Sequence, residues 1–487
     1  MRPDDHDDLD PKDWPSTRAQ AHRMLDDMLD YVEHVRERPV WRPIPEAVKA
    51  GIRQPLPRLP TDLAQVHGEF LRLVLPYATG NVHPGFMGWV HGGGSVAGML
   101  GEMLAAGLNA NLGGREHMPI EVERQILRWL APLFGMPEGA GGLFVTGSSM
   151  ANFMAILVAR TGALGPEVRA RGLAGAPLCA YASAAVHGCV RRGMEMAGIG
   201  GAALRAVPVD RDGRMDLAAL RAAIGADRAA GLRPFLVVGT AGTVDTGAID
   251  PLDGIADAAR AEGLWFHVDG AYGALAQLSS ALAPRLEGIR RADSIALDFH
   301  KWGQVPYDAG YLLVRDGALQ QRTFAAPAAY LGREGRGLAA GSPWPCDFGP
   351  DLSRGFRALK TWFVLKVYGA DHLAAVIEHT CALAQYLKSR VEAAPGLELM
   401  APVELNIVCF RLRGEDPDRL NREVVEALHE SGISAPSTTT LGGRVAIRAA
   451  IVNHRTQPRD IDTLVEAVLA HARVVRSPSP HTPTPCP

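Results

Sequence analysis

The chain has 487 residues, of which 47% are hydrophobic and 21% charged, which is enough for a large buried core and more than one domain. Its 50 Lys and Arg residues face 53 Asp and Glu residues, a net charge of -3, so no basic surplus favours nucleic acid or an anionic membrane. The N-terminus is acidic, and no apolar run reaches the roughly 18 residues of a membrane span. The six cysteines form no CxxC pair, which predicts unpaired thiols and no metal site. We therefore expect a cytoplasmic protein without a nucleic-acid or membrane partner.

The first elements in chain order are a helix and a connector. Apolar residues at helical spacing predict a helix over 16–36, and the Pro-rich stretch 39–60 predicts an extended connector, because Pro cannot continue a helix interior. From about residue 85 to 315, short apolar runs alternate with Ala-rich helical segments. That alternation is typical of a mostly parallel sheet with helices on both faces. The predicted strands are 142–145, 178–182, 235–239, 264–268, 294–297 and 310–314.

The C-terminal part has a different pattern. Residues 354–388 are predicted to be helical, and a strand, a helix, a strand and a helix are then expected at 397–411, 424–428, 444–452 and 460–475. The Pro- and Ser-rich tail predicts disorder. The predicted fold class is α/β: a mostly parallel central sheet with helices on both faces, plus a small C-terminal α/β domain. The expected divisions are an N-terminal helical segment (1–85), a large domain (86–380), a small domain (381–475) and a tail (476–487).

Two of the predicted strands end in residues that pyridoxal phosphate needs. The run LWFHV ends in Asp269, and the run SIAL ends in Asp298, followed by His300 and Lys301. In open α/β sheets, ligands bind beyond the carboxyl ends of the strands. A lysine there supplies the amine for a Schiff base with the cofactor. An acid keeps the ring nitrogen protonated, because a nearby negative charge favours the charged form. The sequence therefore predicts pyridoxal phosphate on Lys301, with Asp269 as the partner of its ring nitrogen.

The phosphate and the flat ring of this cofactor need contacts of their own. Residues 146–149, TGSS, follow an apolar run and precede a helical pattern, so a positively polarised helix N-terminus is expected at the phosphate. His300 is a further candidate for that contact. His187 is expected to stack on the ring, and Thr243 to touch the cofactor. Taken singly, each position has a structural alternative: an N-cap, a core histidine or a turn residue.

With HVDGAYG (267–273) followed by DFHKW (298–302), the chain resembles the group II pyridoxal-dependent decarboxylases, which include aromatic-L-amino-acid, histidine, glutamate and tyrosine decarboxylases. The resemblance runs from about residue 15 to 470. It implies the type I fold of pyridoxal-phosphate-dependent transferases (aspartate aminotransferase-like). It also implies decarboxylation of an L-amino acid, with aromatic ones favoured, to the amine and carbon dioxide. Members are homodimers with active sites at the interface and N-terminal helices that wrap the partner. Further matching motifs are HPGFMGW (83–89), TGSSMANFMAIL (146–157), GTAGTVDTGAIDP (239–251), AYL (329–331), SRGFRALKTW (353–362) and IRAAIVNHRT (447–456).

The resemblance also implies roles for single residues. Tyr330 matches the tyrosine of a mobile loop that protonates the α-carbon, and a tyrosine there favours simple decarboxylation over oxidative aldehyde formation. Ala271 matches a residue that lies against the ring. The implied catalytic residues are Lys301, Tyr330, His187 and Asp269. The implied cofactor contacts are Lys301, Asp269, His187, Ser148, Ser149, Thr243, Ala271, Asp298 and His300.

The expected substrate contacts depart in part from the family pattern. Asn109 and Asn111 fall where aromatic decarboxylases place bulky apolar residues, which indicates a more polar pocket floor. Ser353 falls where some plant relatives sort phenolic from indolic substrates, with serine on the phenolic side. Arg448 matches a position near the active site, and a structural ion pair is the alternative for it. The expected substrate-binding residues are Pro84, Trp89, Asn109, Asn111, Ser353 and Arg448.

Other functions find less support in the sequence. HGGG at 91–94 is similar to the oxyanion motif of esterases, but the G-x-S-x-G of a nucleophile elbow is missing. GIGGAA at 198–203 precedes a predicted strand instead of following one, contrary to a dinucleotide site. Within pyridoxal chemistry, an oxidative decarboxylase or deaminase, an aminotransferase and another lyase stay open, because a shared fold and lysine do not decide which bond breaks.

Overall fold

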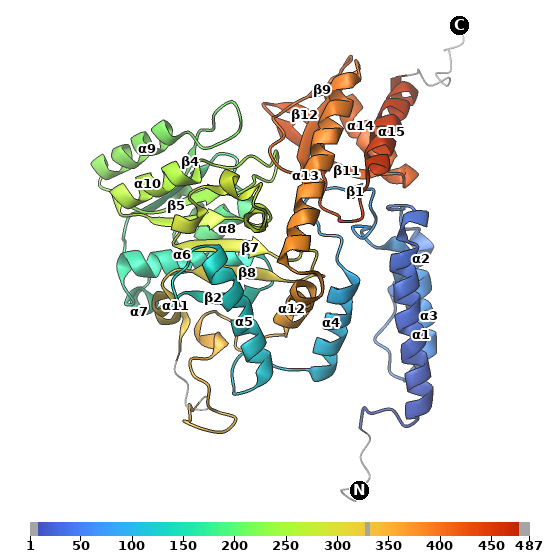
Figure 1. Cartoon of the computed structure of the whole chain (residues 1–487), viewed down its shortest axis with the longest axis horizontal. Helices are drawn as coiled ribbons and strands as arrows, with labels where there is room; N and C mark the ends of the chain where they lie inside the picture. Colours follow the sequence, from blue (N-terminus) through green and yellow to red (C-terminus); the bar gives the residue numbers. More distant parts are fainter. Residues whose placement is uncertain (1–7, 327–331, 477–487) are drawn as a thin grey trace, which may run out of the picture.

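The computed structural model describes residues 8–326 and 332–476, and its largest element is a seven-stranded sheet (Figure 1). The strand order is β2-β8-β7-β6-β5-β3-β4. Strand β8 is antiparallel to both neighbours, whereas the strands from β7 to β4 run parallel. The predicted, mostly parallel sheet is thereby confirmed. Its strands are β2 (Gly141–Val145), β3 (Leu178–Ser183), β4 (Leu204–Val207), β5 (Arg233–Thr240), β6 (Trp265–Asp269), β7 (Ser294–Asp298) and β8 (Gly310–Val314).

Helices cover both faces of this sheet, which is why its strands appear in the sequence as continuous apolar runs. Tyr311 and Leu313 of β8 pack in a core shared with α5, α9 and α10. Leu312 and Val314 point to the other face and pack against α6. Both faces are therefore buried, as predicted. The helices around the sheet are α5 (Met118–Leu133), α6 (Ser148–Leu164), α7 (Val168–Arg171), α8 (Gly188–Met196), α9 (Leu217–Ala229), α10 (Leu252–Glu262) and α11 (Gly317–Phe324).

The parallel strands bring their carboxyl ends to one edge of the sheet. In the register of β5 with β6, Thr240 lies beside Asp269, and β7 ends next to them at Asp298. Three polar residues from three neighbouring strands therefore meet at one edge, although 58 positions separate the first from the last in the sequence (298 minus 240). This edge is where a ligand of an open α/β sheet is expected.

A second sheet has five strands in the order β1-β11-β12-β10-β9. Its short strand β1 (Phe86–Met87) pairs in parallel with β11, whereas the other pairs are antiparallel. The small C-terminal sheet was predicted, but the single strand expected over 397–411 is wrong, because the chain there forms two strands. The polar strand β11 was missed. The remaining elements are β9 (Leu397–Leu399), β10 (Ile407–Leu412), α14 (Pro417–Ser431), β11 (Ala435–Leu441), β12 (Arg444–Ala450) and α15 (Pro458–Arg476).

The helix predicted over 354–388 is divided. Gly369 has a φ of +78° and separates α12 (Arg357–Tyr368) from α13 (Ala370–Ala393), because glycine adopts this backbone conformation without the strain that a Cβ causes. Figure 1 shows α13 running past the second sheet toward the first. The expected boundary at 380/381 falls inside this helix, so the division into domains stays a prediction.

The N-terminal helices lie at one edge of the molecule (Figure 1). Helix α1 (Trp14–Glu33) begins at Asp13, whose carboxylate accepts a hydrogen bond from the Ser16 N–H. The stretch 39–60 is not extended throughout, because α2 (Glu46–Ile52) forms within it; it is followed by α3 (Leu63–Glu69) and α4 (Val96–Leu108). The connector prediction was therefore wrong over the helical residues. Within 8–326 and 332–476, no helix has the length and apolar character to cross a membrane.

Candidate active site

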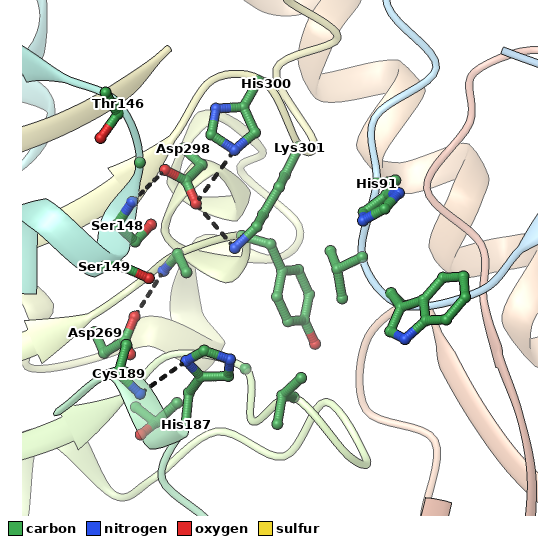
Figure 2. Close-up of a pocket in the computed structure, with 18 of the residues that line it drawn as sticks. His91, Thr146, Ser148, Ser149, His187, Cys189, Asp269, Asp298, His300 and Lys301 are labelled. Atoms are coloured by element: carbon green, nitrogen blue, oxygen red, sulfur yellow. Dashed lines mark hydrogen bonds and ion pairs between the residues drawn. The ribbon is translucent and has the colours of Figure 1, made fainter. Parts of the chain in front are cut away.

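A cavity of about 410 Å³ lies at the carboxyl edge of the seven-stranded sheet. One wall comes from the strand ends and the helix starts that follow them, and His91, in the segment 89–91, lies on the opposite wall (Figure 2). The Tyr307 ring lies between His300 and His91, with centroids 4.3 Å and 5.9 Å away. Residues that are far apart in the sequence are therefore brought together here. The predicted site residues in its lining are Trp89, Ser148, Ser149, His187, Asp269, Ala271, Asp298, His300 and Lys301.

Lys301 and Asp298 form an ion pair at the end of β7. The Lys301 Nζ lies 2.9 Å from Asp298 Oδ2, and the Ser148 N–H donates to Asp298 Oδ1 at 2.7 Å. Burial raises the pKa of Asp298, but the charges of Lys301 and His300 outweigh burial and leave that pKa below its usual value. Burial likewise disfavours the Lys301 ammonium, but the carboxylates of Asp298 and Asp269 raise its pKa. Both shifts favour the charged pair, so the lysine is held at the cavity as an ammonium beside a carboxylate.

Asp269 is a buried carboxylate at the end of β6. It is 3% exposed, and the Ala271 N–H donates to its Oδ1 at 3.2 Å. Among the described residues, no cationic side chain forms an ion pair with it. Burial raises its pKa, against the smaller effects of Lys301 and the Ala271 N–H. A cationic ligand atom beside Asp269 would relieve this desolvation, as a protonated pyridine nitrogen does.

The turn between β2 and α6 forms a polar cradle beside the ion pair. Gly147 precedes α6, and Ser148 and Ser149 are its first two residues. The Ser148 hydroxyl is buried and has no hydrogen-bond partner within the described part of the chain. Close packing also shapes the turn, because a Cβ on Gly310 would lie 2.3 Å from the Gly147 backbone. A free hydroxyl at the N-terminus of a 17-residue helix suits a phosphate group.

His300 and His187 are both held by hydrogen bonds from main-chain N–H groups. The Ala309 N–H donates to His300 Nδ1 at 3.0 Å, and the Cys189 N–H donates to His187 Nδ1 at 3.2 Å. Because each Nδ1 accepts a hydrogen bond, the proton of each neutral imidazole lies on Nε2. His187 is the N-cap of α8 and reaches the cavity from the side of Asp269 (Figure 2).

A buried network lies behind the Asp269 wall. The Trp265 indole N–H donates to Ser294 Oγ at 2.8 Å, and Ser294 Oγ lies 2.8 Å from His267 Nδ1. The Ser294 hydroxyl donates to Nδ1, because the single proton of the neutral His267 is needed on Nε2, whose partner is an amide oxygen that can only accept. That nitrogen lies 2.7 Å from Asn152 Oδ1, and the Asn152 amide donates to Cys189 Sγ at 3.2 Å. Burial lowers the pKa of His267 to about 3, so the network is uncharged.

Other predicted residues lie elsewhere. The Thr243 hydroxyl accepts from the Ala248 N–H at 3.1 Å within a turn. Asn109 ends α4 in the left-handed conformation, and Asn111 Oδ1 accepts from the main-chain N–H groups of Gly113 and Arg354. Six of the predicted cofactor and substrate contacts do not line the cavity of a single chain. Tyr330 falls outside the described residues. The residues that the cavity does not include are Pro84, Asn109, Asn111, Thr243, Ser353 and Arg448.

Arg448 lies behind the cavity wall. Its guanidinium donates to the carbonyl oxygens of Val244 at 2.8 Å and Trp89 at 2.9 Å. Both acceptors belong to segments of the lining, so the arginine ties these two segments together. No ion pair of Arg448 is present among the residues that the structure describes, and its role stays a prediction.

Several lining residues were not predicted from the sequence. Thr240 ends β5, so the strand-end rule used for Asp269 could have found it, whereas Cys189 lies in the first turn of α8, after the loop that follows β3. His91 and Tyr307 come from loops without such a signal, and His91 was considered only as part of an esterase motif. The further missed residues are Val90, Gly242, Val244 and Tyr272.

These groups fit pyridoxal phosphate. The amine of Lys301, the unpaired carboxylate of Asp269 and the free hydroxyl of Ser148 supply a covalent anchor, a partner for a cationic ring nitrogen and a phosphate contact. His187 lines the cavity beside Asp269 (Figure 2) and can cover the flat face of a ring. The arrangement agrees with the cofactor predicted from the strand ends.

Comparisons with known proteins agree with this geometry. A family model described as "Pyridoxal-dependent decarboxylase conserved domain" matches residues 45–413. The chain is 31% identical to the aromatic-L-amino-acid decarboxylase of Bacillus atrophaeus over 94% of this chain and 96% of that protein. It is 34% identical to the L-2,4-diaminobutyrate decarboxylase of Rhizobium meliloti, over 86% of this chain and 84% of the relative. A solved structure of Oryza sativa TDC with PLP and tryptamine superposes with a TM-score of 0.88 at 27% identity, over 96% of this chain and 100% of that one.

Proposed function

This chain belongs to the pyridoxal-dependent decarboxylases, and we propose that it removes the α-carboxylate of an aromatic L-amino acid to give the amine and carbon dioxide. Its fold is that of the type I pyridoxal-phosphate enzymes, its cofactor is pyridoxal phosphate, and its class is that of the carboxy-lyases. The aromatic substrate and the non-oxidative outcome are the parts that we propose.

The observation that carries the aromatic substrate is the absence of charge on one cavity wall. That wall includes Trp89, Val90 and His91, and neither these residues nor Val244 and Tyr307, which also line the cavity, is an acidic residue, a lysine or an arginine. A substrate with a side-chain ammonium or carboxylate would lose water there without gaining a counter-charge, which is costly. A flat apolar ring would instead gain contact area against aromatic side chains. This favours an aromatic amino acid over diaminobutyrate or glutamate.

The strand-end wall is proposed to hold the cofactor. Lys301 is the lysine to which the cofactor is linked, and Asp298, at 2.9 Å, positions its amine. Asp269 holds the ring nitrogen in its protonated form by charge. The bound cofactor supplies an electron sink for the bond that breaks.

The remaining contacts are proposed to orient the cofactor and move protons. Ser148, Ser149 and His300 hold the phosphate, and Ala271 and His187 lie on opposite sides of the ring. His187 presents its Nε2 proton to the cavity, because Nδ1 is occupied by the Cys189 N–H. Tyr330 is proposed to deliver a proton to the α-carbon with the help of His187, and this assignment rests on the matching AYL motif.

We also propose that the active form is a cytoplasmic homodimer. Apolar side chains of the N-terminal region are exposed, including Trp14, Ile52 and Leu59, which is costly in water unless a partner covers them. At the mouth of the cavity, Trp89 is 55% exposed and Tyr307 48% exposed, so a second copy could complete this wall. Cys179, Cys189, Cys346, Cys381 and Cys409 are free thiols, in agreement with a reducing compartment. Sedimentation equilibrium at micromolar concentration tests the dimer, and a monomer at full activity would contradict it.

Product analysis by mass spectrometry tests the reaction. The purified protein with pyridoxal phosphate is incubated in air with aromatic, acidic, basic and aliphatic L-amino acids, and with the Lys301→Ala variant as the control. An aromatic amine with carbon dioxide supports the proposal. An amine from diaminobutyrate or glutamate only would refute the substrate class. An aldehyde with ammonia and peroxide, or a keto acid, would refute simple decarboxylation and indicate the oxidative or the transaminating alternative.

A further inference from the structure

His91 faces the cavity with both ring nitrogens free. Figure 2 shows it on the wall opposite Asp269 and His187, with Lys301 between the two walls. Within residues 8–326 and 332–476, neither nitrogen has a hydrogen-bond partner. Every other histidine described above is held by at least one hydrogen bond. An imidazole without a protein partner in a cavity is available to a ligand.

Aromatic contacts hold the His91 ring instead. Its ring centroid lies 5.7 Å from that of Phe86 at an interplanar angle of 13°, and 5.8 Å from that of Trp89. Tyr307 meets it edge-on, at 5.9 Å and 76°. Stacked and edge-to-face contacts orient a ring without using its nitrogen atoms. The orientation of His91 is therefore set while its hydrogen-bonding capacity stays free.

The backbone after His91 is anchored to the catalytic lysine. A Cβ on Gly92 would lie 2.4 Å from the carbonyl oxygens of both His300 and Lys301, so only glycine allows this approach. The Asn81 side chain donates to the Gly92 carbonyl at 2.9 Å, and Arg455 donates to the Gly93 carbonyl at 3.0 Å. The position of His91 relative to Lys301 is thus determined by main-chain packing.

The imidazole is uncharged at neutral pH. Burial lowers the pKa of His91, and the Lys301 charge lowers it further. A neutral imidazole has one N–H donor and one acceptor nitrogen, so it matches a neutral polar group better than an ion. The wall around it is aromatic, which suits a flat substrate ring. A ring with a hydroxyl group combines both features.

We propose that His91 is a specificity-determining residue that hydrogen-bonds a hydroxyl group on the ring of an aromatic substrate. This inference rests on the proposed function and deepens it, because it selects hydroxylated rings among aromatic amino acids. A purely structural role predicts no difference between a phenol and a phenyl ring. A role in proton transfer at the α-carbon predicts an equal effect on both.

Paired ligands that differ by one hydroxyl test this role. The holoenzyme is titrated with tyramine and with phenethylamine, which lack the carboxylate that is removed, and binding is followed by the change in cofactor absorbance. The same pair is then compared as kcat/KM for L-tyrosine and L-phenylalanine. Wild type is expected to favour the hydroxylated ligand by about 5- to 10-fold, as one neutral hydrogen bond predicts.

Three variants isolate the hydrogen bond. His91→Phe keeps the aromatic contacts but removes the bond, so the preference should fall to about one. His91→Gln can still bond the hydroxyl and should keep part of the preference, and His91→Leu repeats the test if the phenylalanine variant folds poorly. His372→Phe, at an exposed position on α13, is the matched control and should leave the preference unchanged.

The outcomes separate the inference from the function on which it rests. A wild-type preference near one, or a preference that survives in His91→Phe, would overturn the role of His91. Equal losses of kcat for both substrates with an unchanged preference would also overturn it. If no amino acid yields an amine, the proposed function fails, while the binding of tyramine against phenethylamine still decides whether His91 recognises the hydroxyl group.

Discussion

The strand-end wall of the cavity and the wall that carries His91 differ in charge, burial and origin. Asp269 and Asp298 are 3% and 2% exposed, and the register of parallel strands sets their positions. The opposite wall is uncharged, and it is built from loops whose side chains are partly open to solvent. A buried carboxylate must be placed accurately, because a misplaced one loses its water without compensation. An aromatic wall tolerates variation, since apolar contacts are not directional.

The two histidines His267 and His91 show the same difference. His267 lies behind the strand-end wall with both nitrogens hydrogen-bonded. The His91 ring contacts Phe86, Trp89 and Tyr307, and among the described residues its nitrogens have no hydrogen-bond partner. Both imidazoles are neutral. His267 has no hydrogen-bonding capacity left for a ligand, whereas His91 keeps its donor and its acceptor. A structural imidazole has its ring nitrogens hydrogen-bonded within the protein. An imidazole whose nitrogens lack such partners can bind a substrate.

The largest effect is expected from Lys301→Ala, which removes the anchor of the strand-end wall. Decarboxylation should be abolished, because no other lysine among the described residues lines the cavity. Reduction with borohydride followed by peptide mass spectrometry should find no cofactor-labelled peptide. Lys388→Ala, on the surface of α13, should keep the label. A label that persists in Lys301→Ala would mean that another lysine carries the cofactor.

Asp269→Asn should cause the next largest loss. The amide has nearly the same size but no charge, so the cofactor ring nitrogen would lose its partner, and kcat should fall by about 10²- to 10³-fold. Steady-state kinetics at saturating pyridoxal phosphate measures this. If kcat is unchanged, the charge of Asp269 does not contribute to catalysis. The difference in charge between the two walls would then have no role in the reaction.

Gly92→Ala tests how tightly the two walls are coupled. The new Cβ would meet two carbonyl oxygens at 2.4 Å, and the free energy of unfolding should fall by about 1–3 kcal/mol, as for other overpacked sites. Cofactor affinity should fall as well, because Lys301 must shift. Gly107→Ala is the control: a Cβ there meets nothing within 4 Å, and alanine in a helix should stabilise by about 0.5–1 kcal/mol. Urea unfolding checks both. An unaltered Gly92→Ala protein would show that the walls move independently.

The smallest effect concerns the pH dependence of stability. The pKa of His267 is about 3 in the folded protein, below the roughly 6.5 of an unfolded chain. The unfolded state therefore binds more protons between these values, and folding is destabilised as the pH falls through 6.5. At pH 5.5 this group should cost about 1.4 kcal/mol relative to neutral pH.

His267→Gln isolates this contribution. Between pH 7 and pH 5.5, the free energy of unfolding of the variant should fall less than that of the parent, by the contribution of His267. Urea unfolding of both proteins at both pH values measures this difference. His454, whose pKa burial also lowers, to about 4, is present in both proteins and cancels in the comparison. Parallel pH dependences in the two proteins would mean that His267 can be protonated in the folded state.

Much of the fold was predictable, and the failures have physical causes. The six predicted strands of the first sheet were found because burial on both faces makes them continuously apolar. Strand β11 was missed because Ser437, Thr438, Thr439 and Thr440 make it polar, and its pairing with β1 and β12 is a tertiary contact that no local pattern shows. The stretch 39–60 contains a helix between its prolines, at residues where no proline interrupts the hydrogen bonds.

The sequence by itself determined the cofactor side of the site. Lys301, Asp269 and Asp298 follow apolar runs directly, and parallel strands must present their carboxyl ends at one edge. The tertiary structure alone decided the opposite wall. His91 and Tyr307 lie 216 positions apart (307 minus 91) and meet only because Gly92 packs against the backbone of His300 and Lys301. Local sequence encodes which face of a strand is buried, but contacts between loops depend on the packing of the whole chain.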